Sequence, residues 1–233
     1  MDDSRALLAS STRTAERVSA FLTKVYGWMC IGLGITAAVA YLVSSSPALT
    51  SALMANRLVF FALVLAELGL VFFLSARVQS LEPGTAAGLF VAYAALNGVT
   101  LSLILLIYTG ASIATTFIVT GAMFGALAVY GTTTSRSLAG AGQFFVMGLI
   151  GLVLASIVGM FWHNDALQFL ITIVGVIVFT GLTAWDAQRL KQMALELPEG
   201  RAGAYAIVGA LSLYLNFVNL FLMLLRLQSG RRD

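Results

Sequence analysis

The chain has 233 residues, of which 60% are hydrophobic and only 10% charged, and its formal net charge at pH 7 is +3. Too few polar residues are present to cover the surface of a water-soluble domain, so this composition excludes a soluble globular protein. The single cysteine excludes an intrachain disulfide, and the basic residues lie at the ends and in connections, which argues against a nucleic-acid groove.

Seven stretches are apolar over about the 20 residues that a membrane-spanning helix needs. We therefore predict an all-α integral membrane protein, with residues 1–20 as a cytosolic N-terminal tail and residues 21–233 as a seven-helix transmembrane domain. In chain order, the predicted spans are 24–43, 58–76, 85–107, 112–131, 142–162, 167–186 and 204–227. Pro47, Pro83 and Pro198 fall between these spans, where a missing backbone donor costs least.

The distribution of lysine and arginine indicates the orientation, because cytoplasmic connections collect these residues. With the N-terminus inside, nine of them lie on the cytoplasmic side and four on the other side. We therefore expect a cytoplasmic N-terminus. The charge count does not determine on which side of the membrane the basic C-terminal tail lies. If the last segment re-enters the membrane and does not cross it, twelve lysines and arginines lie on the cytoplasmic side and one on the other side.

Polar residues inside spans are costly in lipid, so they mark candidate functional positions. Glu67 lies in the middle of the second span without a basic neighbour. It is expected to be either a neutral acid that is bonded to another helix or a part of an ion path or gate. Arg77 ends the same span, as an interfacial anchor or as an ion-pair partner. In the third span Tyr93, Asn97 and Thr100 have the spacing of one helix face.

The last span carries a longer polar stripe, which indicates that this helix faces other helices. The stripe consists of Tyr205, Gly209, Ser212, Asn216 and Asn219. Hydrogen bonds between helices or the lining of a pore would each explain it. Asp186 ends the sixth predicted span and is followed by Arg189 and Lys191, so by itself it is typical of a solvated interfacial charge.

Catalytic and metal-binding motifs are missing from the sequence. It contains no HExxH, GxSxG or P-loop motif and no cluster of cysteine and histidine. We therefore expect neither an enzyme nor a bound cofactor.

Five segments resemble, in order and spacing, the Bax inhibitor-one family, also called the transmembrane Bax inhibitor motif family, and especially its small bacterial members. They are AELGLVFFLSAR (66–77), ALNGVTLSLI (95–104), FIVTGAMFGALAVYG (117–131), FTGLTAWDAQRLK (179–191) and GALSLYLNFVNLFLMLLR (209–226). The resemblance implies that helix seven lies centrally between two three-helix layers. It also implies a bacterial inner membrane protein that acts as a pH-sensitive calcium leak.

The resemblance implies that two aspartates form the pH sensor in this family. One lies at the position of Asp186, and the other lies in a motif that reads LYLDF. Here that motif reads LYLNF, so the second position is Asn216. Two carboxylates in contact share a proton, whereas an aspartate and an asparagine do not repel each other. We therefore expect Asp186 and Asn216 to form the gating pair, with altered pH gating.

The remaining candidates follow from this hypothesis. Residues of a possible ion path or gate are Glu67, Arg77, Asn97, Ser212 and Asn219. Calcium prefers oxygen ligands, and Asp186 and Glu67 are expected to bind it only in transit, with Arg77 as a further partner of Asp186.

Two other functions stay open. The protein could be a non-conducting regulator that binds other membrane proteins, such as a membrane-anchored protease, through its N-terminal tail. It could also be a proton-coupled transporter, which would need broken helices near the middle of the membrane.

Overall fold

A computed structural model describes residues 2–162, 164–198 and 202–229 of the chain. Within this part, seven helices are long and apolar enough to cross a membrane, which confirms the predicted all-α membrane fold. These spans are Thr12–Ser44, Leu58–Arg77, Pro83–Ile107, Gly110–Thr133, Ala139–Gly159, Asp165–Glu196 and Ala202–Gln228. Arg201, Arg231 and Arg232, which contribute to the charge count, lie outside the described residues.

The chain forms two compact units, and its last two long helices each contribute to both. The first unit comprises Met1–Tyr108 and Leu190–Leu211, and the second comprises Thr109–Arg189 and Ser212–Asp233. The central position of helix seven between two three-helix layers stays a prediction.

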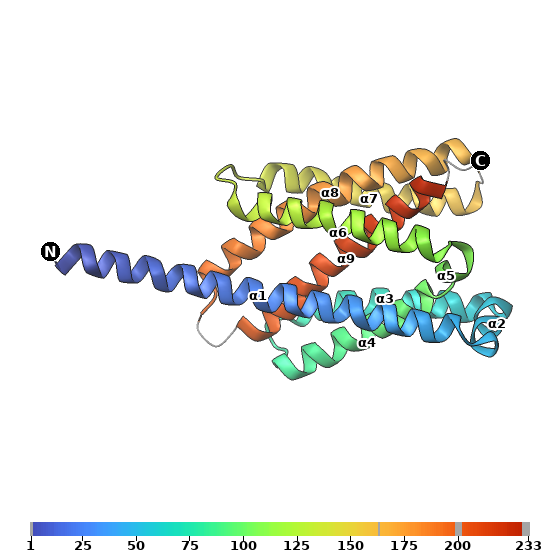
Figure 1. Cartoon of the computed structure of the whole chain (residues 1–233), viewed down its shortest axis with the longest axis horizontal. Coiled ribbons are helices and arrows are strands. Elements are labelled where there is room, and N and C mark those ends of the chain that lie inside the picture. Colours follow the sequence, from blue (N-terminus) through green and yellow to red (C-terminus); the bar gives the residue numbers. More distant parts are fainter. Residues whose placement is uncertain (1, 163, 199–201, 230–233) are drawn as a thin grey trace. The chain divides into compact units, whose positions relative to one another are not determined.

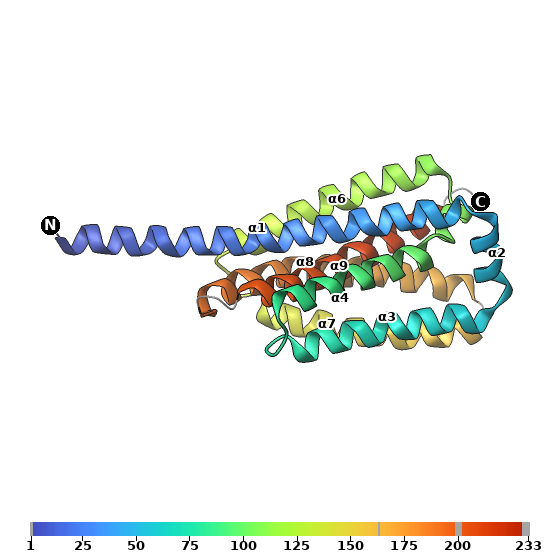
Figure 2. The same cartoon turned by 90° about the horizontal axis from the view of Figure 1, so that it is seen from below.

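The first unit is built on one long helix and its two neighbours. Its N-terminal helices are α1 (Asp2–Ser44), α2 (Pro47–Ala55), α3 (Arg57–Arg77), α4 (Pro83–Leu101) and α5 (Ile104–Ile107). Helix α4 packs along both α1 and α3, and α2 joins α1 to α3 (Figures 1 and 2). Residues 2–20 of the predicted tail are helical, and residues 12–20 already belong to the first span Thr12–Ser44. The cytosolic location of the tail stays a prediction.

The third span is interrupted close to its end, although its hydropathy is continuous. Helix α4 ends at Leu101, and after two residues α5 adds a single turn up to Ile107. The fully buried Ser102 lies at the break, and its hydroxyl donates to the carbonyl of Val99 at 2.6 Å. The break occurs without a proline, at a residue whose hydroxyl bonds the preceding turn.

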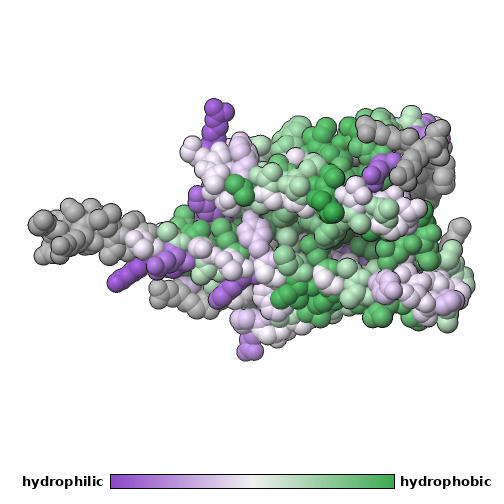
Figure 3. Space-filling model, in the orientation of Figure 1, coloured by the Kyte–Doolittle hydropathy of each residue, from purple (hydrophilic) through white to green (hydrophobic). Residues whose placement is uncertain are grey.

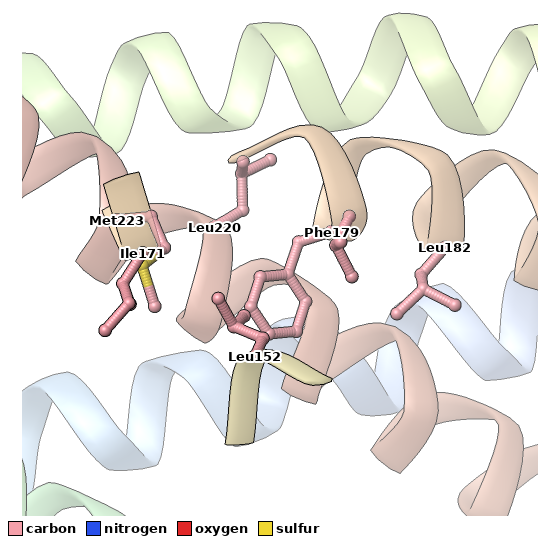
Figure 4. Packing of buried hydrophobic residues seen from close by; sticks show 7 residues of the cluster. Leu152, Ile171, Phe179, Leu182, Leu220 and Met223 are labelled. Carbon is pink, nitrogen blue, oxygen red and sulfur yellow. The ribbon is translucent and has the colours of Figure 1, made fainter. Parts of the chain in front are cut away.

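The second unit packs three helices and the end of a fourth around an apolar core. It contains α6 (Gly110–Thr133), α7 (Ala139–Phe161), α8 (Asp165–Glu196) as far as Arg189, and α9 (Ala202–Ser229) from Ser212 onward. Buried side chains of α7, α8 and α9 form this core, and Figure 4 shows six of them by name. They are Leu152, Ile171, Phe179, Leu182, Leu220 and Met223. The core joins α8 to α9 beside the polar residues described below.

Helix α8 is longer than the sixth predicted span, and this corrects the placement of Asp186 at a helix end. The helix continues past Asp186 to Glu196. The added sequence AQRLKQMALE consists of good helix formers. It also buries Ala187, Leu190 and Ala194, with exposed fractions of 0, 4 and 5%. Packing on one face therefore keeps this charged segment helical, and Asp186 lies within the helix.

Large apolar side chains cover the outer faces of the helices, as a lipid environment requires. Leu58 and Phe72 on α3 and Phe144 and Met147 on α7 are among those that are more than two-thirds exposed. Figure 3 shows hydrophobic residues over much of the visible face, with several strongly hydrophilic residues along the N-terminal part of α1. The protein is thus an integral membrane protein.

Close packing of α1 on α4 depends on Gly98. A Cβ atom at this position would lie 2.8 Å from the carbonyl oxygen of Thr36 and 2.8 Å from Cβ of Val39. The hydroxyl of Thr36 donates to the carbonyl of Ala94 at 2.8 Å, one turn earlier on α4. Small residues permit such backbone approach between membrane helices.

We predict that Gly98→Ala separates α1 from α4 and lowers the free energy of unfolding by about 1–3 kcal/mol. The matched control is Gly88→Ala on the same helix, because a Cβ atom there meets nothing within 4 Å. Alanine is the better helix former, so the control should be neutral or more stable by up to about 1 kcal/mol. Thermal unfolding in detergent measures both variants, and equal melting temperatures would contradict the prediction.

Candidate functional site

Asp186 is a carboxylate buried inside a membrane-spanning helix. Its exposed fraction is only 6%. A Cβ atom at Gly131 of α6 would meet the carbonyl of Ala184, and one at Gly142 of α7 would meet the ring of Trp185. Glycine on both neighbouring helices thus lets α8 approach them just before Asp186.

Two side chains of α9 hold this carboxylate. The hydroxyl of Ser212 and the Nδ2 amide of Asn216 each donate a hydrogen bond of 2.7 Å to Oδ2 of Asp186. Ser212 and Asn216 are four residues apart on one face of α9. The predicted contact between Asp186 and Asn216 is therefore present, and the predicted polar face of the last span meets a carboxylate here.

The hydrogen bonds determine the chemistry that this contact can perform. An ionised carboxylate only accepts hydrogen bonds, while the side-chain nitrogen of asparagine only donates. Asn216, itself only 6% exposed, therefore stabilises the position of Asp186 without taking up a proton. Arg189, one turn further on, lies with its guanidinium carbon 5.6 Å from the centre of the Trp185 ring, in the range of a cation–π contact.

Gln188 fixes the neighbouring connection and was missed by the sequence analysis. Its Oε1 accepts from the backbone nitrogen of Leu138 at 2.7 Å, and its Nε2 donates to the carbonyl of Arg136 at 2.9 Å. The buried amide thus ties the connection between α6 and α7 to α8, two residues after Asp186. No local pattern could reveal this role, since both partners are backbone groups about 50 residues away.

A second carboxylate cluster lies in the first unit. Glu67 of α3 accepts a hydrogen bond of 3.2 Å at Oε2 from Nδ2 of Asn97, and one of 2.9 Å at Oε1 from the hydroxyl of Thr100. Asn97 and Thr100 share the face of α4 that their spacing predicted. Glu67 is thus half-buried and bonded to the neighbouring helix at both oxygens.

The other predicted residues are placed differently. Asn219 donates to the carbonyl of Leu215 on its own helix at 2.8 Å, so its amide bonds the backbone and not Asp186. Arg77 is exposed at the end of α3. Because Arg77 and Glu67 belong to the first unit and Asp186 to the second, pairing of Arg77 with Asp186, and calcium binding by both carboxylates along one path, stay predictions.

We predict that Gln188→Leu lowers the free energy of unfolding by about 1–3 kcal/mol, because it removes the two hydrogen bonds that this buried amide makes to the backbone of Arg136 and Leu138. Gln192→Leu is the matched control, since Gln192 is exposed one turn later on the same helix. Hydrogen exchange should also become faster around Leu138 in Gln188→Leu only. Equal exchange in the two variants would show that Gln188 does not hold this connection.

Comparison with known proteins identifies the family. A family model described as "Inhibitor of apoptosis-promoting Bax1" matches residues 18–233. Inner membrane protein YbhL of Escherichia coli strain K12 is 48% identical over 215 residues, which cover 91% of this chain and 92% of the relative. Uncharacterized proteins of Borreliella burgdorferi and Deinococcus radiodurans are 43% and 41% identical, over 91% and 94% of this chain and 93% and 94% of their own. These matches extend over nearly the whole sequence, so the chain belongs to the Bax inhibitor-1 family.

Proposed function

We propose that this protein is a passive cation leak, above all for calcium, in which the contact of Asp186 with Asn216 acts as the gate. The observation that carries the proposal is a carboxylate, 6% exposed, inside a membrane-spanning helix and bonded by two side chains of the next helix. Ionisable groups at such positions are expensive and typically mark ion pathways or gates. Two hydrogen bonds join α8 and α9 at this point, and their breakage would separate the helices.

The ligand chemistry supports a hard cation. Calcium binds carboxylate, amide and hydroxyl oxygens, and Asp186, Ser212 and Asn216 offer these groups together. Glu67 with Asn97 and Thr100 offers the same set in the first unit. In this proposal each cluster contacts calcium only in transit, and the protein is neither an enzyme nor the holder of a resident cofactor.

Asn216 sets the expected response to pH. Two carboxylates at this contact would share a proton at low pH and repel each other once both are ionised. The side chain of asparagine is uncharged at both low and high pH. The contact of Asp186 with Asn216 is therefore not broken by repulsion between like charges. We therefore propose a leak whose dependence on pH is weaker than an aspartate pair would confer.

The proposed location is the bacterial inner membrane with a cytoplasmic N-terminus. The printed name of the E. coli relative places that protein in the inner membrane, and the excess of lysine and arginine on one side supports the orientation.

A second candidate function is regulation of another membrane protein, such as a membrane-anchored protease. The observation that favours it is the exposed segment of residues 12–17 in α1, which a partner could contact. Deleting residues 2–17 removes this segment and leaves residues 18–44 of the first span, more than the about 20 residues that a crossing needs. Loss of partner binding after this deletion would support the regulator, and unchanged partner binding would count against it.

Our first functional prediction concerns pH. The assay measures calcium flux into proteoliposomes loaded with a calcium-sensitive dye. We expect the flux through the wild type to vary little between pH 6 and 8, and the flux through Asn216→Asp to be faster at pH 8 than at pH 6. The reason is that the second carboxylate loses its proton as pH rises, and two like charges then separate α8 from α9. Asn219→Asp is the matched control, because Asn219 bonds its own helix, and it should behave as the wild type does.

The outcome that contradicts the leak is equally clear. If neither the wild type nor Asn216→Asp moves calcium while a reconstituted control channel does, the regulator becomes the better proposal. If Asn219→Asp gains the same pH dependence as Asn216→Asp, the position of the gate is wrong.

A further prediction concerns the two carboxylates. Asp186→Asn and Glu67→Gln keep the size of each side chain and remove its charge, so each should lower calcium flux by roughly tenfold or more if the cation contacts that group. Thermal unfolding of both variants shows whether they fold. Folded variants with unchanged flux would exclude Asp186 and Glu67 from the path.

A further inference from the structure

A cavity of about 240 Å³ lies in the first unit, where the start of the first span meets the end of α8 and the start of α9 (Figure 1). Among the described residues, eight line it: Arg17, Ala20, Phe21, Lys24, Ala194, Leu197, Pro198 and Ala202. None of the residues assigned to the proposed leak lines it.

Two cations lie at this cavity. Arg17 and Lys24 are seven residues apart, which is two turns or about 10 Å along one face of α1. Nη2 of Arg17 donates to the carbonyl oxygen of Leu197 at 2.9 Å, which holds the guanidinium at the cavity. Within the part of the chain that the structure describes, no carboxylate pairs with either cation and no acidic residue lines the cavity. The positive charge of Arg17 and Lys24 is thus not balanced by any acidic residue in the described part of the cavity wall.

The remaining lining is apolar. Phe21 and Ala194 are only 4% and 5% exposed, and Ala20, Leu197, Pro198 and Ala202 complete the wall. A free inorganic anion would gain nothing from this wall. A ligand with an anionic group beside an apolar part would use both the cations and the wall.

The position in the chain points to the same class of ligand. Arg17 and Lys24 lie in the first part of the span Thr12–Ser44, where a spanning helix passes through the headgroup layer. Basic pockets between membrane helices are recognised sites for anionic lipid headgroups.

We propose that this cavity binds the headgroup of an anionic phospholipid. The phosphate lies between Arg17 and Lys24, and the glycerol backbone and the first part of the acyl chains lie against Phe21 and its apolar neighbours. The bound lipid joins α1 to the end of α8 and the start of α9. The inference depends on the membrane location of the protein and not on calcium conduction.

The test compares lipid retention by native mass spectrometry of the full-length protein in detergent. Phosphatidylglycerol should be retained at least roughly tenfold more tightly than phosphatidylcholine. The double variant R17Q/K24Q should lose that preference by roughly tenfold or more, given what each basic residue contributes near an anionic surface. The matched control R13Q/R136Q removes the same charge from two exposed residues outside the cavity and should keep the preference.

A second variant tests the cavity without altering charge. Ala20 is exposed and lines the cavity, so Ala20→Phe should fill it from the rim and abolish the preference without disturbing the buried core. Its thermal unfolding in detergent should match that of the wild type, so loss of lipid is not loss of fold.

Three results would overturn the proposal. If R17Q/K24Q and R13Q/R136Q lose the preference for phosphatidylglycerol equally, the preference reflects a general attraction of basic residues to anionic lipid. Full retention in Ala20→Phe would mean that lipid does not enter the cavity. Displacement of phosphatidylglycerol by equimolar inorganic phosphate or glycerol 3-phosphate would mean that the site takes a free phosphate and that the apolar wall plays no part.

Discussion

The cost of placing a carboxylate inside a membrane is the constraint on which the second unit depends. Asp186 is almost fully buried, and a charge or an unpaired polar group at that depth is unfavourable unless the protein supplies donors. Ser212 and Asn216 supply two of them to the same oxygen. The polar face of α9 therefore lies opposite the acid of α8, and a polar contact joins the two helices beside their apolar core.

Glycine makes that contact possible. At Gly131 and Gly142 a side chain would meet α8 next to Asp186, so α6 and α7 can approach the helix only because these residues have none. Gln188 then bonds the connection between α6 and α7 to the same part of α8. The position of one carboxylate is thus determined by packing, by a buried amide and by two donors, which is the support a gate needs if its closed state is to be well defined.

The first unit solves the same problem with other residues. Glu67 receives donors from Asn97 and Thr100 of α4, and α4 is held against α1 at Gly98 and through the hydroxyl of Thr36. In both units an acid on one helix is bonded by residues three or four positions apart on the next. If cations cross this protein, they meet oxygen-rich clusters of similar composition in each unit, and in one of them Asn216 donates a hydrogen bond to the carboxylate.

The sequence alone determined the membrane class, the seven spans and the polar faces of the third and last spans. These properties are local, because hydropathy over about 20 residues and the 3.6-residue period can be read from a short window. The resemblance to the family added the pairing of Asp186 with Asn216, which local patterns did not contain. The tertiary structure decided which partner each polar residue meets. Hydrogen bonds such as those of Gln188 and Glu67 join groups that are 30 or more residues apart.

The end of α8 shows the same division. Its charges predicted an interface after Asp186, but burial of Ala187, Leu190 and Ala194 continues the helix to Glu196. That extension brings Ala194 and Leu197 to Arg17 and Lys24 and so creates the cavity. Hydropathy shows where charged residues lie and how long an apolar stretch is. The packing of one apolar helix face depends on residues elsewhere in the chain. For this reason the spans follow from the sequence, and the partners of Glu67 and Gln188 and the cavity follow only from the fold.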